Sequence, residues 1–244
     1  MRDDVHERPA LVSGDADGAE VGVGPWPGEW PDDPRYDPDL LASGDRRNVV
    51  DRFRYWTMDA IVSALDAERH PFHVAIENWQ HDLNIGSIVR SANAFGAGAV
   101  HIIGRKRWNR RGAMVTDRYQ HVEHHETVPE FLARMRELGL EVVAVDNVPG
   151  SVPIERTPLP ERCVLVFGQE GPGLSPEVLD AAGLVVEITQ FGSTRSINAA
   201  AAAAVVMHDW VLRHRYGWEP GRGAAQASSS NAAGTHAPRN CREP

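Results

Sequence analysis

Residues 163–175 read Cys-Val-Leu-Val-Phe-Gly-Gln-Glu-Gly-Pro-Gly-Leu-Ser, a short apolar run followed at once by a glycine-rich loop. Such an apolar run is typical of a buried parallel strand. Gly168, Gly171 and Gly173 allow positive φ angles and a close approach of the backbone to a ligand. Ligands of open α/β sheets bind beyond the carboxyl ends of strands, where this loop lies. The loop matches neither a P-loop nor the GxGxxG fingerprint, and on its own it also fits an ordinary strand-to-helix turn.

On both sides of this segment, short apolar runs alternate with stretches in which apolar residues recur every three or four positions, as in a helix. Strands are predicted at 72–77, 99–103, 141–145, 163–167 and 184–188, and helices at 48–68, 85–95, 128–138, 176–181 and about 197–213. No internal repeat is visible. Strands that alternate with helices predict an α/β fold with a parallel sheet.

The two ends of the chain differ in composition from its middle. Residues 1–45 are rich in Asp, Gly and Pro and carry 12 acidic residues against 3 arginines, so they account for the whole formal charge of −9. Residues 217–244 are rich in Gly, Ala and Ser. Both segments lack apolar periodicity and are predicted to be disordered. Between them we expect a helical segment at 46–70 and a single folded domain at 71–216.

A second motif follows the predicted strand 72–77. Residues 84–96 read Asn-Ile-Gly-Ser-Ile-Val-Arg-Ser-Ala-Asn-Ala-Phe-Gly, and Asn84 stands where a helix N-cap is expected. The apolar side chains would form the core face of this helix, while Ser87 and Arg90, three residues apart, would share the other face. On its own, the pattern also fits a capped surface helix with a solvated arginine.

A third motif precedes the last predicted helix. Residues 188–198 read Ile-Thr-Gln-Phe-Gly-Ser-Thr-Arg-Ser-Ile-Asn and are followed by six alanines, 199–204. Polar groups therefore cluster where the helix begins, and the alanines would let another backbone approach closely. A good helix former with a polar cap would have the same sequence.

In this order and spacing, the three motifs resemble those of the SpoU/TrmH-type RNA ribose methyltransferases of the SPOUT superfamily. The resemblance covers about residues 72–214. It implies a SPOUT fold with a C-terminal trefoil knot, S-adenosylmethionine (SAM) as cofactor, a homodimer that completes the site, and methylation of a ribose 2′-hydroxyl of tRNA or rRNA. The third motif differs slightly from the usual pattern of this family, since it reads Ser196-Ile197-Asn198-Ala199 in place of Ser-Leu-Asn-Val. The change affects packing more than chemistry.

The resemblance also implies roles for single residues. It makes Arg90 the residue that activates the hydroxyl, while Asn84, Glu170, Ser196 and Asn198 orient Arg90 and the ribose. An arginine stays protonated, so stabilising the developing alkoxide is easier chemistry for it than acting as a base. The residues implied to contact the cofactor are Phe167, Gly168, Glu170, Gly171, Gly173, Leu174, Ile188, Ser196 and Ile197.

A cluster of cations follows the strand predicted at 99–103. It consists of Arg105, Lys106, Arg107, Arg110 and Arg111, arranged around Trp108. Positive charge beside a stacking surface suits loop or single-stranded RNA, although a charge run alone is more often a solvated face. We therefore expect these six residues to bind RNA.

Histidines also gather in one stretch of the chain, at His121, His124 and His125. They are predicted to be surface residues, because no carboxylate or cysteine has an obvious coordinating spacing. No metal is therefore expected.

The composition of the chain argues against a membrane protein and against a secreted one. Two cysteines, no apolar run of the ~20 residues that span a bilayer and no apparent signal peptide predict a cytoplasmic protein without membrane contact. Two alternatives stay open: a base methyltransferase on the same fold, and a non-catalytic RNA-binding SPOUT module. Arg90 favours ribose chemistry over base chemistry. The intact set of expected catalytic residues argues against a loss of activity.

Overall fold

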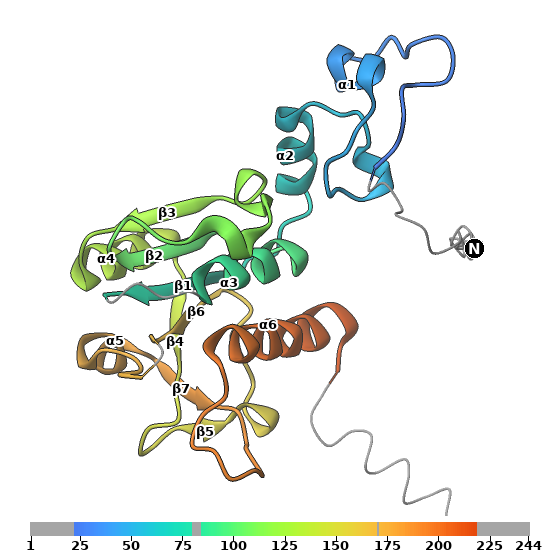
Figure 1. Ribbon diagram of the computed structural model, residues 1–244. Coiled ribbons are helices and arrows are strands. Elements are labelled where there is room, and N and C mark those ends of the chain that lie inside the picture. Colours follow the sequence, from blue (N-terminus) through green and yellow to red (C-terminus); the bar gives the residue numbers. More distant parts are fainter. Residues whose placement is uncertain (1–21, 80–83, 170, 219–244) are drawn as a thin grey trace, which may run out of the picture. The chain divides into compact units, whose positions relative to one another are not determined.

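Seven parallel strands form the central sheet of the computed structural model, which describes residues 22–79, 84–169 and 171–218. The chain divides into two units, one ending at Ile61 and one beginning at Val62. The sheet belongs to the second unit, and its strand order is β3-β2-β1-β6-β4-β7-β5 (Figure 1). The strands are β1 (His73–Asn78), β2 (Val100–Gly104), β3 (Val122–His125), β4 (Glu141–Val145), β5 (Val152–Pro153), β6 (Cys163–Phe167) and β7 (Leu184–Glu187).

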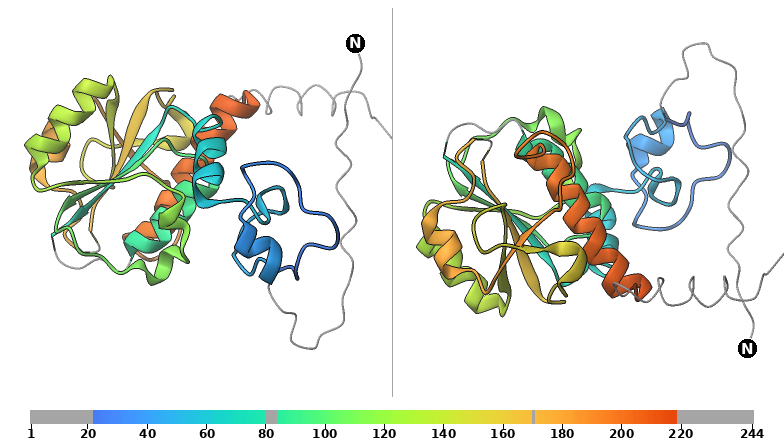
Figure 2. Two further views of the ribbon diagram at one scale, coloured as in Figure 1. Left: turned by 90° about the horizontal axis from the view of Figure 1, so that it is seen from above. Right: turned by 90° about the horizontal axis from the view of Figure 1, so that it is seen from below.

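Helices cover both faces of this sheet, which explains why its central strands are apolar throughout. All five residues of β6 are buried. Helices α3 (Asn84–Ala94) and α6 (Ala199–Tyr216) pack on one face, and α4 (Val128–Leu138) and α5 (Pro176–Ala181) on the other (Figure 2). The α/β fold with a parallel sheet is therefore confirmed.

The strand order places the candidate loops at one edge. From β1 the chain first builds outward to β2 and β3, then crosses to the other side of β1 to form β4 and β6. Since all pairings are parallel, the carboxyl ends of β4, β6 and β7 lie along the same edge. Ligands of open α/β sheets bind at such a change of direction.

Helix starts follow the local sequence closely. At the start of α4, the Thr127 side chain accepts a hydrogen bond from the Glu130 amide. At the start of α5, the Ser175 side chain accepts one from the Val178 amide. Both helices have a proline in the first turn. The helices predicted at 128–138 and 176–181 and the strands predicted at 141–145 and 163–167 are confirmed at both ends. The pattern gave no signal for β3 and β5, because β3 is polar and β5 has only two residues.

The first unit corrects the prediction of disorder over residues 1–45. Residues 1–21 lie outside the described residues, but residues 38–43 form helix α1 (Pro38–Ser43), capped by Asp37. Val23 pairs with Asp45 in a short antiparallel bridge. The apolar residues of this unit have no regular spacing in the sequence. Contacts between aromatic rings form its interior instead, since Trp26 packs edge-on against both Tyr36 and Tyr55.

The single helix predicted at 48–68 is wrong in its first half. A short 3-10 helix, η1 (Asp51–Phe53), comes first, and helix α2 (Met58–Asp66) begins only after a turn. Tyr55 interrupts the helix because its φ is +63°, and because its amide donates to the Asp45 carboxylate (2.9 Å). Asp45 is completely buried and also accepts two hydrogen bonds from the Arg47 side chain, at 2.9 and 2.7 Å.

We predict that Asp45→Asn loosens the first unit. Burial alone would raise the pKa of Asp45, but hydrogen bonds from Arg47 and from the Tyr55 amide lower it to about 2. The stabilisation is therefore present above the ordinary pKa and is lost as the pH falls toward about 2. The variant should lose on the order of 2 kcal/mol at neutral pH.

Hydrogen exchange at the amides of Val23 and Tyr55 measures this loss, and Asp51→Asn serves as the control because the Asp51 side chain is 96% exposed. Equal exchange in both variants would contradict the assigned role of Asp45.

Candidate functional site

A pocket of about 490 Å³ lies at the carboxyl ends of β4, β6 and β7. Three chain segments form its walls: the end of β4, the glycine-rich loop after β6, and the segment between β7 and α6. The lining residues are Val145, Asp146, Asn147, Phe167, Gly168, Gln169, Gly171, Gly173, Glu187, Ile188, Gln190, Arg195, Ser196, Ile197, Asn198, Ala199 and Ala202.

The glycine-rich loop folds back on itself at the pocket. Gln169 and Gly173 exchange backbone hydrogen bonds of 3.2 Å in each direction. A Cβ atom on Gly168 would lie 2.2 Å from the Gly173 carbonyl carbon, so only glycine fits there. Gly173 itself has a φ of +73°. The loop therefore keeps its backbone close to the cavity, as expected for a ligand-binding turn.

Buried polar groups hold this loop in place. Glu77, at the end of β1, is completely buried and accepts the Ser175 amide (2.7 Å) and the Trp79 indole N–H (3.0 Å). The side-chain oxygen of Gln169 accepts the Trp79 amide (2.9 Å). Because the Ser175–Glu77 and Gln169–Trp79 contacts join the loop region to the end of β1, the loop cannot shift independently of the sheet.

A hydrogen bond between two asparagines brings the first and third motifs together. Asn198 caps α6, where its side-chain oxygen accepts the amides of Ala200 and Ala201. Its Nδ2 donates to Asn84 Oδ1, 2.8 Å away, at the start of α3. The N-termini of α3 and α6 thus meet at the rim of the pocket.

Most residues implied to contact a cofactor line this pocket. These are Phe167, Gly168, Gly171, Gly173, Ile188, Ser196 and Ile197. Leu174 does not line it, because its side chain is buried in the core beneath the loop. Glu170 lies outside the described residues.

Arg90 does not line this pocket. It lies six residues along α3 from Asn84, about 9 Å at 1.5 Å per residue. The side chain is exposed on the same helix face as Ser87, as the spacing predicts. It makes no hydrogen bond or ion pair with any residue that the structure describes. Among the described residues nothing therefore prevents its guanidinium from meeting a group from outside the chain.

Comparison with known proteins shows which family the chain belongs to. The profile of the SpoU rRNA methylase family matches residues 71–208, more than half of the chain. This chain belongs to the SpoU rRNA methylase family.

A tRNA (guanosine(18)-2′-O)-methyltransferase from Borreliella burgdorferi is 30% identical over 143 residues. The match covers 57% of this chain and 66% of that protein, slightly under two thirds of its length. A solved structure of the SpoU methyltransferase AviRb from Streptomyces viridochromogenes, in complex with the cofactor AdoMet, is 25% identical with a TM-score of 0.54. It covers 62% of this chain and 60% of the other.

A TrmH/SpoU tRNA modifying enzyme from A. aeolicus is 21% identical, with a TM-score of 0.58. The alignment covers 71% of this chain and 93% of that chain and supports the shared SPOUT-type fold.

Sequence reasoning missed six polar residues of the pocket in this SpoU chain: Asp146, Asn147, Gln169, Glu187, Gln190 and Arg195. Asp146 and Asn147 directly follow β4, and Gln190 and Arg195 lie between β7 and α6. Asp146 accepts the Leu174 amide (2.9 Å), and Asn147 donates to the Arg195 carbonyl. The position of Asp146 and Asn147 after a predicted strand was the available signal.

The basic residues lie beside the first motif. Asn78 Nδ2 donates to the carbonyls of Arg105 (2.7 Å) and Arg107 (3.1 Å), which fixes the loop after β2. The loop continues into η2 (Arg110–Ala113), whose backbone contacts α3 so closely that a Cβ on Gly86 would clash with it.

The basic side chains themselves face the solvent. Arg105, Lys106, Arg107, Arg110 and Arg111 are all exposed, and Trp108 is half-buried. Arg110 lies over the Trp108 ring and 3.4 Å from Asp117. The chain therefore presents its basic loop next to the helix that carries Arg90.

The prediction that the histidines at 121, 124 and 125 are surface residues is wrong for His125. His121 is exposed and contacts Asp66, and His124 is half-buried, but His125 is buried beside His101 of β2. Burial lowers the pKa of His101 to about 2 and that of His73 to about 4, so both rings are neutral at pH 7. Burial also lowers the pKa of His125.

We predict that Gly168→Ala impairs ligand binding without unfolding the sheet. The new methyl group would displace the backbone at Gly173 and Leu174 and so distort the pocket wall. Calorimetric titration with SAM should show about a 10-fold or greater loss of affinity, about 1.4 kcal/mol.

Gly192→Ala is the matched control, because a Cβ there meets nothing within 4 Å. Unchanged affinity in Gly168→Ala would show that the loop does not shape the binding site.

Proposed function

We propose that this SpoU-family chain is a SAM-dependent RNA methyltransferase that methylates a ribose 2′-hydroxyl of tRNA or rRNA. The observation that carries the proposal is the meeting of all three motifs at one pocket. The second and third motifs line it, and the Asn198–Asn84 hydrogen bond attaches the helix of the first motif to its rim. Family membership and the 2′-O-methyltransferase relative support the same reading.

The pocket fits SAM by size and chemistry. Its volume of about 490 Å³ lies within the usual range for small-molecule sites. Phe167, Ile188 and Ile197 offer apolar contacts for the adenine ring, and the backbone near Gly168 can approach the adenosine. Asp146 and Arg195 supply polar groups for the ribose and the methionine moiety. When bound, SAM supplies an electrophilic methyl group.

Arg90 is proposed to stabilise the substrate oxygen as its proton leaves. A guanidinium remains protonated, so it can pair with a developing alkoxide while a substrate phosphate assists in removing the proton. Asn84 and Asn198 hold α3 against α6, and Ser196 and Glu170 are proposed to help orient the ribose. Much of the rate enhancement would then come from positioning.

The separation of Arg90 from the pocket supports a homodimer in which Arg90 serves the cofactor bound by the partner subunit. Large apolar side chains around the start of α6 are exposed in the single chain: Phe191 by 96%, Ile197 by 38% and Val205 by 45%. Covering these side chains would bury apolar surface and stabilise a pair of chains.

RNA is proposed to approach over the basic loop. Its five exposed cations can neutralise phosphates, and Trp108 can stack on an unpaired base. Asn78 holds the loop beside α3, which would bring the bound RNA toward Arg90.

The trefoil knot and a cytoplasmic location are part of the same proposal. The knot follows from the family resemblance, and the location follows from the cysteine content and composition of the sequence. Within the described ranges, no helix combines the length and apolar character needed to cross a bilayer.

We predict that Arg90→Ala folds and binds SAM normally but transfers methyl groups to RNA about 100-fold more slowly, the scale of losing one preorganised electrostatic group. Arg90→Lys should not restore the full rate, because an ammonium lacks the planar guanidinium. Transfer of radiolabel from SAM to total RNA measures the rate, and Ser87→Ala is the control on the same helix face. Full activity of Arg90→Ala would refute its role.

We also predict that two impaired variants, assayed at a limiting SAM concentration, complement each other in a mixed dimer. A chain with Arg90→Ala keeps its pocket, and a chain with Gly168→Ala keeps its Arg90. Unfolding and refolding the two together should recover partial activity, since one site of the mixed dimer is then intact. No recovery, with mixed dimers demonstrated by mass spectrometry, would place Arg90 and the pocket in the same chain.

Neutralising Arg105, Lys106, Arg107, Arg110 and Arg111 together should weaken RNA binding and flatten its dependence on salt, because fewer counterions are released. SAM affinity should not change. Filter binding over a range of salt concentrations measures the slope, with the exposed pair Arg136→Gln and Arg156→Gln as the control. An unchanged slope would make the loop a solvated surface only.

A further inference from the structure

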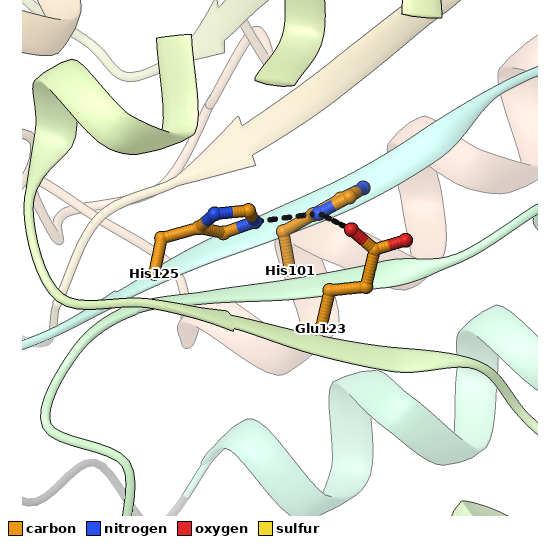
Figure 3. A group of neighbouring side chains, drawn as sticks. All are labelled: His101, Glu123 and His125. Carbon is orange, nitrogen blue, oxygen red and sulfur yellow. Dashed lines mark hydrogen bonds and ion pairs between the residues drawn. The ribbon is translucent and has the colours of Figure 1, made fainter. Parts of the chain in front are cut away.

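A row of three imidazoles crosses the half of the sheet farthest from the pocket; His101 and His125 are buried and His73 is half-buried. His73 Nδ1 lies 2.8 Å from His101 Nε2, and His101 Nδ1 lies 3.0 Å from His125 Nε2. The Glu123 carboxylate reaches the same point, 3.8 Å from His101 Nδ1. Figure 3 shows the two histidines and the glutamate converging from neighbouring strands.

Strand geometry explains this convergence. Glu123 and His125 are two residues apart on β3, so their side chains leave the same face of the sheet. The parallel register places His101 of β2 opposite Glu123. The spacing is invisible in the sequence, because His101 is more than twenty residues away from the other two.

We propose that His101, Glu123 and His125 bind a divalent transition metal ion, with zinc as the expected metal. Two imidazole nitrogens and a carboxylate oxygen are typical zinc ligands, and a neutral imidazole is the form that binds metal. One ligand atom from each residue lies within 4.8 Å of the others. Ligand atoms around a tetrahedral zinc are about 3.3–3.6 Å apart. Small side-chain movements would therefore complete the site.

The surrounding charges favour a dication. A pocket beside the cluster is lined by Glu123, Glu130 and Glu137 and by one cation, Arg134. Leaving the histidines aside, these carboxylates exceed the positive charge by two. The pocket also leaves room for water as a fourth ligand.

Two neighbouring groups can orient the ligands. Arg134 Nε lies 3.2 Å from Glu123 Oε2, the same oxygen that faces His101, and so holds the carboxylate toward the cluster. His73 contacts the ring nitrogen of His101 that faces away from Glu123 and His125. Such outer hydrogen bonds are usual around metal ligands and fix the orientation of the rings.

The location indicates a structural role for the metal. β3 is the edge strand of the sheet, and a metal held by His101 and His125 would tie it to β2. None of the residues that line this second pocket lines the pocket at β4, β6 and β7. Metal binding should therefore stabilise the fold without taking part in methyl transfer.

The test uses the untagged full chain after treatment with a chelator. Calorimetric titration with Zn²⁺ should show one ion per chain, and Co²⁺ should give the visible absorption of a tetrahedral site with nitrogen and oxygen ligands. His125→Gln and Glu123→Gln should each weaken zinc binding by at least on the order of 100-fold, more than loss of an outer hydrogen-bond partner costs. Zinc should raise the melting temperature of the native chain but not of these variants.

His121→Gln is the matched control, since His121 is exposed and contacts Asp66 outside the cluster. Glu123 is half-buried, so Glu123→Gln should keep the metal-free fold even if His125→Gln does not, and circular dichroism checks this. Absence of a zinc site, or equal zinc affinity in Glu123→Gln and the control, would overturn the proposal and leave a hydrogen-bonded histidine row.

Discussion

The hydrogen bond from Asn198 to Asn84 joins segments that are 114 residues apart in the chain, and the architecture of the site depends on it. The same Asn198 side chain caps α6, a role usually worth about 1 kcal/mol. One amide group thus sets where α6 begins and where α3 begins relative to it. The two helices then lie side by side, with Ile88 and Val89 of α3 and Ala203 and Val206 of α6 in one core cluster. The alanine-rich start of α6 suits this close approach.

A buried carboxylate has a comparable role on the opposite side of the loop. Burying the Glu77 carboxylate costs free energy. Two hydrogen bonds offset this cost, one from the Trp79 ring N–H and one from the Ser175 backbone N–H. Together with Gln169, it attaches the glycine-rich loop to β1 at the centre of the sheet. The pocket therefore has a rigid wall on one side and the capped helix α6 on the other, which suits a reaction that depends on positioning.

The elements predictable from the sequence were those that bury apolar side chains periodically. β4 and β6 are runs of apolar residues, and α4 and α5 begin with a clear cap followed by proline. β3, in contrast, reads Val-Glu-His-His, and only pairing with β2 makes it a strand. The unit ending at Ile61 depends on Asp45, Arg47 and edge-on aromatic contacts, which have no period in sequence.

The same distinction applies to the site. The position of the pocket could be predicted from the three contiguous motifs, because each follows a strand or begins a helix at the same edge of the sheet. Contacts made across the fold, such as Asn78 with the basic loop and His101 with His125, depend on strand register. The position of Arg90 outside the pocket also required the structure, since helical spacing gives its face but not its distance from other loops.

The most direct test of the central claim is the position of the transferred methyl group. Alkaline cleavage of RNA uses the 2′-oxygen as nucleophile, so a methyl group on that oxygen leaves an alkali-resistant dinucleotide. RNA labelled by this protein from methyl-labelled SAM should yield its label in such dinucleotides after alkaline digestion. Label released as a methylated base in a mononucleotide would contradict the account and indicate a base methyltransferase on the same fold.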